Sequence, residues 1–140
     1  MTPDPKRILV VEDNLADFIL LREMLRQEAD GQFDLSSTGS LVETLALIER
    51  ERFDAVLLDL SLPDSFGVKT ITRLCGAAPA MPILVMSGLT DEQVAAEAIR
   101  CGAEDYLVKG QADAPSIIRA IEQAIDRKRA KETARVNPPQ

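Results

Sequence analysis

The sequence predicts an α/β fold: a doubly wound, parallel sheet of five strands with five helices on its two faces. Short apolar runs of Val, Leu and Ile alternate five times with stretches of helical periodicity. The apolar runs contain no alternating polar residues, which is typical of strands buried on both faces in a parallel sheet. The chain has 140 residues, a single-domain length and too short for a TIM barrel of about 250 residues.

The elements follow one another as five strand–helix pairs. The expected strands are Arg7–Val11, Phe33–Ser37, Ala55–Leu58, Ile83–Met86 and Asp105–Val108. The expected helices are Ala16–Glu28, Leu41–Arg50, Val68–Cys75, Glu92–Arg100 and Ser116–Arg135. Repeated units of this length form an open sheet with right-handed crossovers.

Three of the helices carry start signals. Ser40 with Glu43, and Thr90 with Gln93, fit a capping box, in which each side chain accepts a hydrogen bond from the other residue's backbone N–H. Pro115 fits the first turn of the last helix, where a missing N–H leaves no hydrogen bond unmade. Each signal stands where the apolar pattern already predicts that a helix begins.

Glycines mark the ends of three helices. Gly31, Gly76 and Gly102 follow the first, third and fourth helical stretches. A residue in the left-handed conformation commonly closes a helix, and glycine adopts it without steric cost. We therefore expect these three glycines to be left-handed.

The last helix is expected to be longer than the sheet requires. Its apolar stripe fades after Arg127, and the residues that follow are polar on every side. We therefore expect a folded domain over residues 1–127 and a polar helical extension with a disordered tail over residues 128–140. This extension is either a solvated end or the start of a linker.

Composition excludes several classes of function. A net charge of −7 argues against nonspecific nucleic-acid binding, which needs a positive surface. The absence of histidine excludes Ser-His-Asp and Cys-His mechanisms. Cys75 and Cys101 are isolated, so we expect reduced thiols rather than a disulfide or a zinc site. No apolar run spans a membrane and no signal peptide is visible, so we expect a cytoplasmic protein.

Acidic residues follow two of the apolar runs. Glu12 and Asp13 end the first run, and Asp59 ends the third. Carboxyl ends of parallel strands meet at one edge of the sheet, where ligands bind at the switch in strand order. Three carboxylates there need a cation, and Mg²⁺ prefers oxygen ligands. The alternative is that these acids complement helix dipoles, an alternative that is weaker for Asp59 because no helix follows it directly.

Two more polar residues end neighbouring strands. Ser87 follows the fourth apolar run and Lys109 follows the fifth. Taken singly, Ser87 would be a turn residue and Lys109 a surface lysine. A hydroxyl and an ammonium that converge on three carboxylates are instead donors suited to a phosphoryl group.

These pieces resemble the receiver domain of two-component response regulators, over about Lys6 to Arg127. The matching segments are Val10–Asn14, Leu57–Asp64, Val85–Gly88 and Gly102–Lys109. The resemblance implies a flavodoxin-like sheet of strand order 2-1-3-4-5, as in a single-domain chemotaxis regulator.

The resemblance also implies roles for the site residues. Asp59 would accept a phosphoryl group from a histidine on a sensor kinase or phosphotransfer protein. Mg²⁺ would be held by Asp13, Asp59 and the carbonyl of Ser61, and Glu12 would assist. Oxygens of the phosphoryl group would be contacted by Lys109 and Ser87. The protein would be a switch that assists its own phosphorylation and dephosphorylation, not an enzyme.

Switching would follow from the new charge on Asp59. By resemblance, Ser87 moves toward the phosphoryl group and Tyr106 turns inward behind it. The surface that changes is formed by Glu92–Arg100, the strand with Tyr106 and the last helix. We expect it to contact a downstream protein target, or a second copy of the chain in a homodimer, and neither nucleic acid nor a membrane.

One residue departs from the family pattern. Receiver domains usually have a cis proline after the lysine, whereas this chain has Gly110. A cis bond before glycine costs about 3 kcal/mol. We therefore expect a trans bond and a more mobile loop.

Two other functions fit the sequence less well. A Mg²⁺-dependent phosphatase with an aspartyl-phosphate intermediate would have a second acid two residues after the nucleophile, where this chain has Ser61. A flavodoxin would need a phosphate loop after the first strand and aromatic side chains against its flavin. Glu12 and Asp13 stand in that loop, and the chain has one Tyr and no Trp.

Overall fold

The fold is a five-stranded sheet with helices on both faces. A computed structural model describes residues 4–88 and 90–136. The strands are β1 (Lys6–Val11), β2 (Phe33–Thr38), β3 (Ala55–Leu58), β4 (Ile83–Ser87) and β5 (Asp105–Val108). The helices are α1 (Leu15–Ala29), α2 (Leu41–Arg50), α3 (Lys69–Ala77), α4 (Glu92–Arg100) and α5 (Ala114–Val136). Each predicted element is present, and every boundary agrees within two residues.

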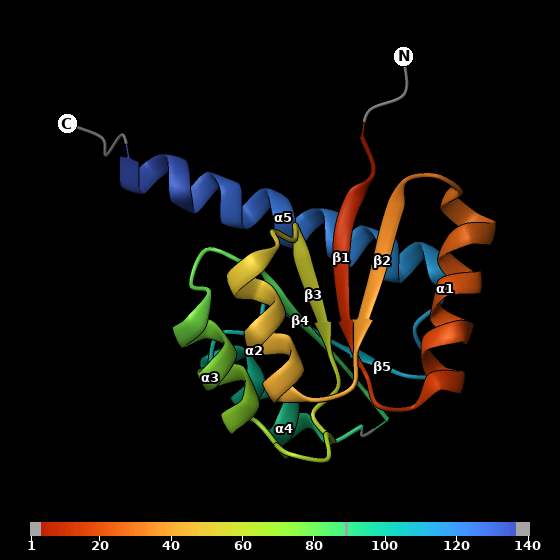
Figure 1. Ribbon diagram of the computed structural model, residues 1–140, viewed down its shortest axis with the longest axis horizontal. Helices are drawn as coiled ribbons and strands as arrows, with labels where there is room; N and C mark the ends of the chain where they lie inside the picture. Colours follow the sequence, from red (N-terminus) through yellow and green to blue (C-terminus); the bar gives the residue numbers. More distant parts are fainter. Residues whose placement is uncertain (1–3, 89, 137–140) are drawn as a thin grey trace.

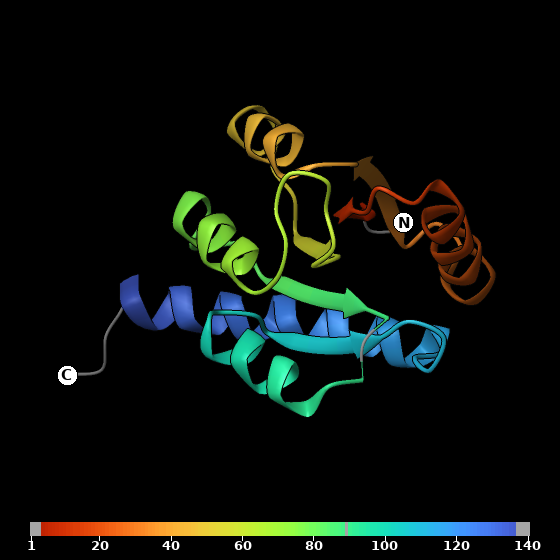
Figure 2. The same ribbon diagram turned by 90° about the horizontal axis from the view of Figure 1, so that it is seen from below.

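The strands are parallel and lie in the order β2-β1-β3-β4-β5 (Figure 1). The chain moves outward from β1 to β2, and then crosses to β3 on the other side of β1. The strand order therefore reverses between β1 and β3, where Val11 is paired with Leu58. The view from below in Figure 2 shows the twist of the sheet. In this view β4 and β5 lie across the picture, whereas β1 is seen nearly end-on.

The two faces of the sheet bury separate apolar clusters. One face packs against α1 and α5, and its buried residues include Ile8, Leu57, Leu84, Ile117 and Ile121. The other face packs against α2, α3 and α4, and its buried residues include Leu9, Val56, Leu58, Ile71 and Leu74. Alternate side chains of each central strand supply both clusters, which explains the uninterrupted apolar runs of the sequence.

The predicted cap of α2 by Ser40 is confirmed, and the predicted cap of α4 by Thr90 is wrong. Ser40 Oγ accepts the N–H of Glu43 at 3.1 Å. At α4 the cap is Asp91, whose Oδ1 accepts the N–H of Gln93 at 2.8 Å, and not Thr90. The helix begins at Glu92, so the residue directly before it takes the capping role, and a short carboxylate does so well.

Two of the three predicted left-handed glycines are confirmed. Gly31 has φ of 81° and Gly102 has φ of 119°. Gly76 is not left-handed, because α3 continues through it to Ala77. Pro79 lies two residues beyond that end, and a proline biases the residue before it away from the helical conformation, so the chain leaves the helix without glycine. Pro115 lies in the first turn of α5, as predicted.

Helix α5 continues without a break past Arg127. Arg127 Nε lies 3.2 Å and Lys128 Nζ 3.6 Å from carboxylate oxygens of Glu104, which precedes β5. Arg129 lies 3.9 Å from Asp54, which precedes β3. The beginning of the predicted extension therefore contacts the amino-terminal edge of the sheet. The predicted disordered tail at residues 137–140 lies outside the described residues.

None of the helices in the described part of the chain has the length and apolar character needed to cross a bilayer.

Candidate functional site

Three carboxylates meet where the strand order reverses. Glu12 and Asp13 follow β1, and Asp59 follows β3. The pairing continues one residue beyond the strands, because the N–H of Asp59 donates to the carbonyl of Val11 at 3.0 Å. One carboxylate oxygen from each of the three acids lies within 4.8 Å of the other two. The fold therefore brings together the acids that the sequence predicted to converge.

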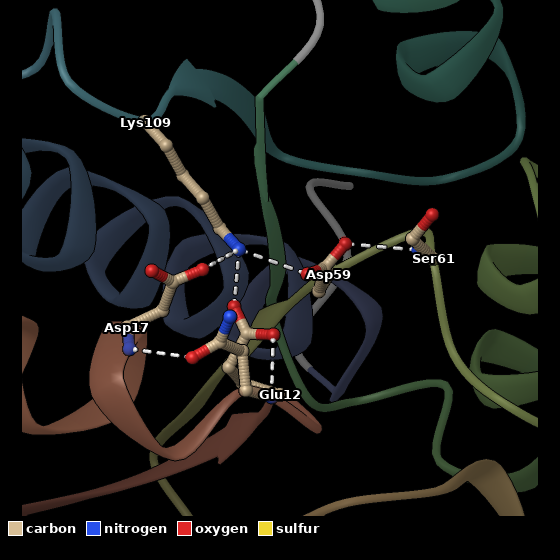
Figure 3. Close-up of polar contacts among 6 residues, drawn as sticks. Glu12, Asp17, Asp59, Ser61 and Lys109 are labelled. Atoms are coloured by element: carbon tan, nitrogen blue, oxygen red, sulfur yellow. Dashed lines mark hydrogen bonds and ion pairs between the residues drawn. The ribbon is translucent and has the colours of Figure 1, made fainter.

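Lys109 reaches into this carboxylate group from the end of β5 (Figure 3). Its Nζ lies 2.9 Å from Asp59 Oδ2 and also donates to Glu12 Oε1. A third acid, Asp17, lies 3.0 Å from the same ammonium. Pairing with three carboxylates compensates for the partial burial of the ammonium.

Asp59 has a partner on each carboxylate oxygen. Oδ1 accepts the N–H of Ser61 at 2.9 Å, and Oδ2 accepts from Lys109. Glu12 and Asp59 are each only 9% exposed, whereas Asp13 and Ser61 are exposed. Asp59 is therefore a fixed carboxylate at the bottom of an open acidic site.

The pKa values of both Glu12 and Lys109 are raised, for different reasons. Burial, together with the neighbouring Asp59, raises the pKa of Glu12 to about 7, and its hydrogen bond with Lys109 only partly offsets this. Burial alone would lower the pKa of Lys109, but hydrogen bonds to Glu12, Asp59 and Asp17 raise it above its ordinary value. Lys109 therefore stays a cation.

The turn after β5 sets the direction of Lys109. The N–H of Lys109 donates to the carbonyl of Ser87 at 2.8 Å, and the N–H groups of Gln111 and Ala112 close a turn onto Val108. Gly110 has φ of 83°, in the left-handed region. Every peptide bond in the described residues is trans, so the trans Lys109–Gly110 bond is confirmed. The greater mobility expected of this loop stays a prediction.

Ser87 lies on β4, the strand next to β3 and Asp59, and Tyr106 lies on β5, one strand further. Ser87 ends β4, is 4% exposed, and is paired with Val108 of β5. Tyr106 is half-buried on β5 and packs against the cluster on the α2–α3–α4 face. All the predicted site residues except Tyr106 therefore lie at or next to one edge of the sheet, and Tyr106 lies on the strand between Lys109 and α4.

Asp17 and Asp64 make contacts that were not predicted from the sequence, and Asp17 is the one that lies beside the site. Asp17 lies in the first turn of α1 and contacts Lys109. Asp64, from the β3–α3 loop, accepts the N–H groups of Leu41 and Val42 at 2.8 and 2.9 Å and so caps α2 from outside. The available signal for Asp17 was an acid four residues after Asp13, but acids are common in a first helical turn.

A cavity of about 240 Å³ adjoins the acidic site. Glu12, Asp17, Asp59 and Lys109 form its polar part. The rest is lined by apolar side chains of β1, β3, β4 and α1, among them Leu20, Leu21, Met24 and Met86, and by the small residues Gly110 and Ala112. The space lies on the α1–α5 side of the sheet.

Comparison with known families gives this arrangement an identity. The family profile of the response regulator receiver domain matches residues 8–122, which is most of the chain and includes every site residue above. The chain belongs to this family. Receiver domains are phosphoacceptor switches of two-component signalling and are generally not classical enzymes.

A curated relative of this receiver domain is the transcriptional regulatory protein ZraR of Escherichia coli K12. The two are 31% identical over 109 residues, which cover 78% of this chain and 24% of that protein. The chain therefore spans about a quarter of that relative's length.

Solved structures with the same fold include two from other bacteria. A response regulator of Burkholderia pseudomallei, described with a phosphorylated aspartic acid, a calcium ion and citrate, is 30% identical with a TM-score of 0.72, covering 95% of this chain and 75% of that one. The receiver domain of the sensor histidine kinase PA1611 of Pseudomonas aeruginosa, described with a magnesium ion in its active-site cleft, is 22% identical with a TM-score of 0.73, covering 87% and 98%. The flavodoxin-like fold with strand order 2-1-3-4-5 is thus confirmed.

Proposed function

We propose that this receiver domain is switched by phosphorylation of Asp59. The observation that carries the proposal is the pair of contacts on that carboxylate, from Lys109 at 2.9 Å and from the Ser61 N–H at 2.9 Å. These donors hold Asp59 in one orientation, facing an acidic opening. The Burkholderia pseudomallei relative, which is described with a phosphorylated aspartic acid, supports this role.

The donor is a phosphohistidine of a sensor kinase or phosphotransfer protein. Receiver domains interact with such proteins, and this chain contains no histidine of its own. A carboxylate oxygen of Asp59 attacks the phosphorus, an O–P bond forms, and the P–N bond to the donor imidazole breaks. The imidazole leaves with the electron pair of that bond and takes up a proton. Lys109 and Ser87 stabilise the charge on the oxygens of the transferred group.

The carboxylate group fits a magnesium ion. Receiver domains bind Mg²⁺ at an acidic site, and three carboxylate oxygens within 4.8 Å of one another match its preference for hard oxygen ligands. We assign Asp13, Asp59 and the carbonyl of Ser61 as its ligands, with Glu12 assisting. When bound, the ion would offset the charge of these acids and of the phosphoryl oxygens.

The output surface is formed by α4, β5 and α5. Phosphorylation adds charge and three acceptor oxygens beside Ser87. In this proposal Ser87 turns toward them and Tyr106, which already packs toward α4, moves inward. The changed surface contacts a downstream protein or a second copy of the chain as a homodimer. The relative ZraR is a transcriptional regulatory protein, so a DNA-binding protein is one class of target in this proposal.

Phosphorylation by a small acyl phosphate tests the acceptor. The protein is incubated with Mg²⁺ and acetyl phosphate, and its intact mass is measured over time. The wild type should gain one phosphoryl group, and Asp59→Asn should gain none. Asp34 is exposed and lies near the start of β2, away from the site, so Asp34→Asn is the matched control and should behave as the wild type.

Equal addition to Asp59→Asn and the wild type would refute the assignment of Asp59. Chelation of Mg²⁺ should abolish the gain, and an unchanged rate in chelator would refute the metal assignment.

A further inference from the structure

Lys109 is held in place by charge more than by packing. Its backbone is anchored to Ser87, but the next residue is Gly110, which has no side chain and stands at φ of 83°. The cavity of about 240 Å³ lies beside Lys109 and leaves its side chain room to move. The turn fixes the backbone of Lys109 but not the far end of its side chain, so the position of the ammonium depends on the three carboxylates around it.

These three carboxylates are not equivalent. Glu12 and Asp59 belong to the group with Asp13, which the proposed function commits to Mg²⁺ and to the phosphoryl group. The carboxylate group found among the described residues does not include Asp17. Asp17 Oδ2 lies 3.0 Å from Lys109 Nζ. Of the three partners of Lys109, Asp17 is therefore the one that the proposed function does not assign to Mg²⁺ or to the phosphoryl group.

The fold holds Asp17 firmly. Its backbone N–H donates to Asn14 Oδ1 at 3.2 Å, and the N–H of Asn14 donates to Glu12 Oε2 at 3.2 Å. The next residue, Phe18, is buried against the sheet and fixes the first turn of α1. Figure 3 shows Asp17 and Asp59 on opposite sides of the Lys109 ammonium.

We infer that Asp17 is a positioning residue that keeps the ammonium of Lys109 directed at Asp59. This inference rests on the proposed phosphorylation of Asp59. While Glu12 and Asp59 take up other partners, Asp17 remains paired with Lys109. The ammonium then stays at the site where the oxygens of the transferred group arrive, rather than turning into the cavity or toward solvent. In this chain the ion pair from α1 restrains a lysine whose following residue is glycine.

The rival explanation is that Asp17 only stabilises α1. An acid in the first turn of a helix interacts favourably with the helix dipole. That role would affect the free energy of unfolding, but it would leave the motion of Lys109 and the rate of phosphoryl transfer unchanged.

The first test measures Lys109 in the presence of Mg²⁺, which engages Glu12 and Asp59 in the proposed function, and without any phosphodonor. NMR relaxation of the Lys109 ε-carbon should report increased motion in Asp17→Asn, restored order in Asp17→Glu, and no change in Asp34→Asn. Unchanged motion in Asp17→Asn would overturn the inference, whether or not Asp59 is phosphorylated.

The second test measures the rate of phosphorylation by acetyl phosphate. Asp17→Asn should lower the maximal rate constant by about three- to tenfold, with little change in the half-saturating concentration of the donor. Asp17→Glu should recover most of that rate. In a Lys109→Ala background, Asp17→Asn should have no further effect, because the residue acts through Lys109.

The two failures are separable. An equal loss of rate with and without Lys109, or a wild-type rate in Asp17→Asn, would overturn the role of Asp17. Equal phosphorylation of the wild type and Asp59→Asn would refute the proposed function instead.

Discussion

At the scale of single residues, the site combines a buried acid with a cation that several acids share. Glu12 is almost fully buried, and its two carboxylate oxygens contact Lys109 and the N–H of Asn14. The chain contains no histidine. The pKa of Glu12, raised to about 7, lies near neutral pH.

The first prediction concerns the pH dependence of stability without metal. The pKa of Glu12 rises from 4.5 to about 7 on folding, so the folded protein retains a proton that the unfolded chain releases. The free energy of unfolding should fall by about 1–3 kcal/mol as the pH rises from 4.5 to 8. Urea unfolding in chelator-containing buffer measures this, and Glu12→Gln should flatten the slope.

Glu49→Gln, an exposed acid on α2, is the control and should retain the slope. A slope of the same size in Glu12→Gln would contradict the assignment to Glu12.

The residue scale also shows where sequence reasoning reached its limit. Glu12, Asp13, Asp59, Ser87 and Lys109 could be predicted because each ends an apolar run, and parallel strands end at one edge. Asp17 could not, because its contact with Lys109 joins residues 92 positions apart. That contact depends on how the first turn of α1 faces the β5–α5 loop, which no periodicity encodes.

At the scale of elements, strands were more predictable than helix ends. The central strands β1, β3 and β4 contain uninterrupted apolar runs, so their burial on both faces could be predicted from the residue types alone. The ends of helices depend on which of several neighbouring residues caps or stops the helix. Asp91 caps α4 where Thr90 was expected, and Pro79 takes over the stop that was expected of Gly76.

The second prediction compares two left-handed glycines. A Cβ at Gly102 would lie 2.6 Å from Cys75 Sγ, whereas a Cβ at Gly110 would meet nothing within 4 Å. Gly110→Ala should cost about 1 kcal/mol, from backbone strain alone. Gly102→Ala should cost about 2–4 kcal/mol, because the clash adds to the strain. Urea unfolding of both variants measures the difference.

Removal of the Cys75 side-chain sulfur provides the control. Relative to Cys75→Ala, the double variant Cys75→Ala/Gly102→Ala should show only the backbone cost seen at Gly110. A penalty at Gly102 that persists without the sulfur would contradict the clash.

At the scale of the whole molecule, β3 couples the two apolar clusters. Leu57 points to the α1–α5 face and Leu58 to the α2–α3–α4 face, and both are buried. Since neighbouring residues of one strand supply both clusters, neither face can lose its packing without disturbing the other. The protein should therefore unfold in a single transition.

The third prediction tests this coupling. Leu57→Ala and Leu58→Ala should each lower the free energy of unfolding by about 2–5 kcal/mol. Tyr106, the single tyrosine of the chain, packs on the face opposite to Leu57 and reports on that face by fluorescence. In Leu57→Ala its transition should shift together with the far-ultraviolet circular dichroism. A Tyr106 transition that stays at the wild-type midpoint would contradict a single cooperative unit.

Helix α5 runs from the carboxyl edge of the sheet to the amino-terminal edge and so separates two surfaces to which partner proteins could bind. It begins five residues after Lys109, at the carboxyl edge of the sheet, and its later residues pair with Glu104 and Asp54 at the opposite edge. Figure 1 shows the helix crossing behind the strands and projecting beyond them. A protein bound over Asp59 would lie at the carboxyl edge of the sheet, and a protein bound at the Val136 end of α5 would lie beyond the opposite edge. Both could be engaged at once without competing for the same surface.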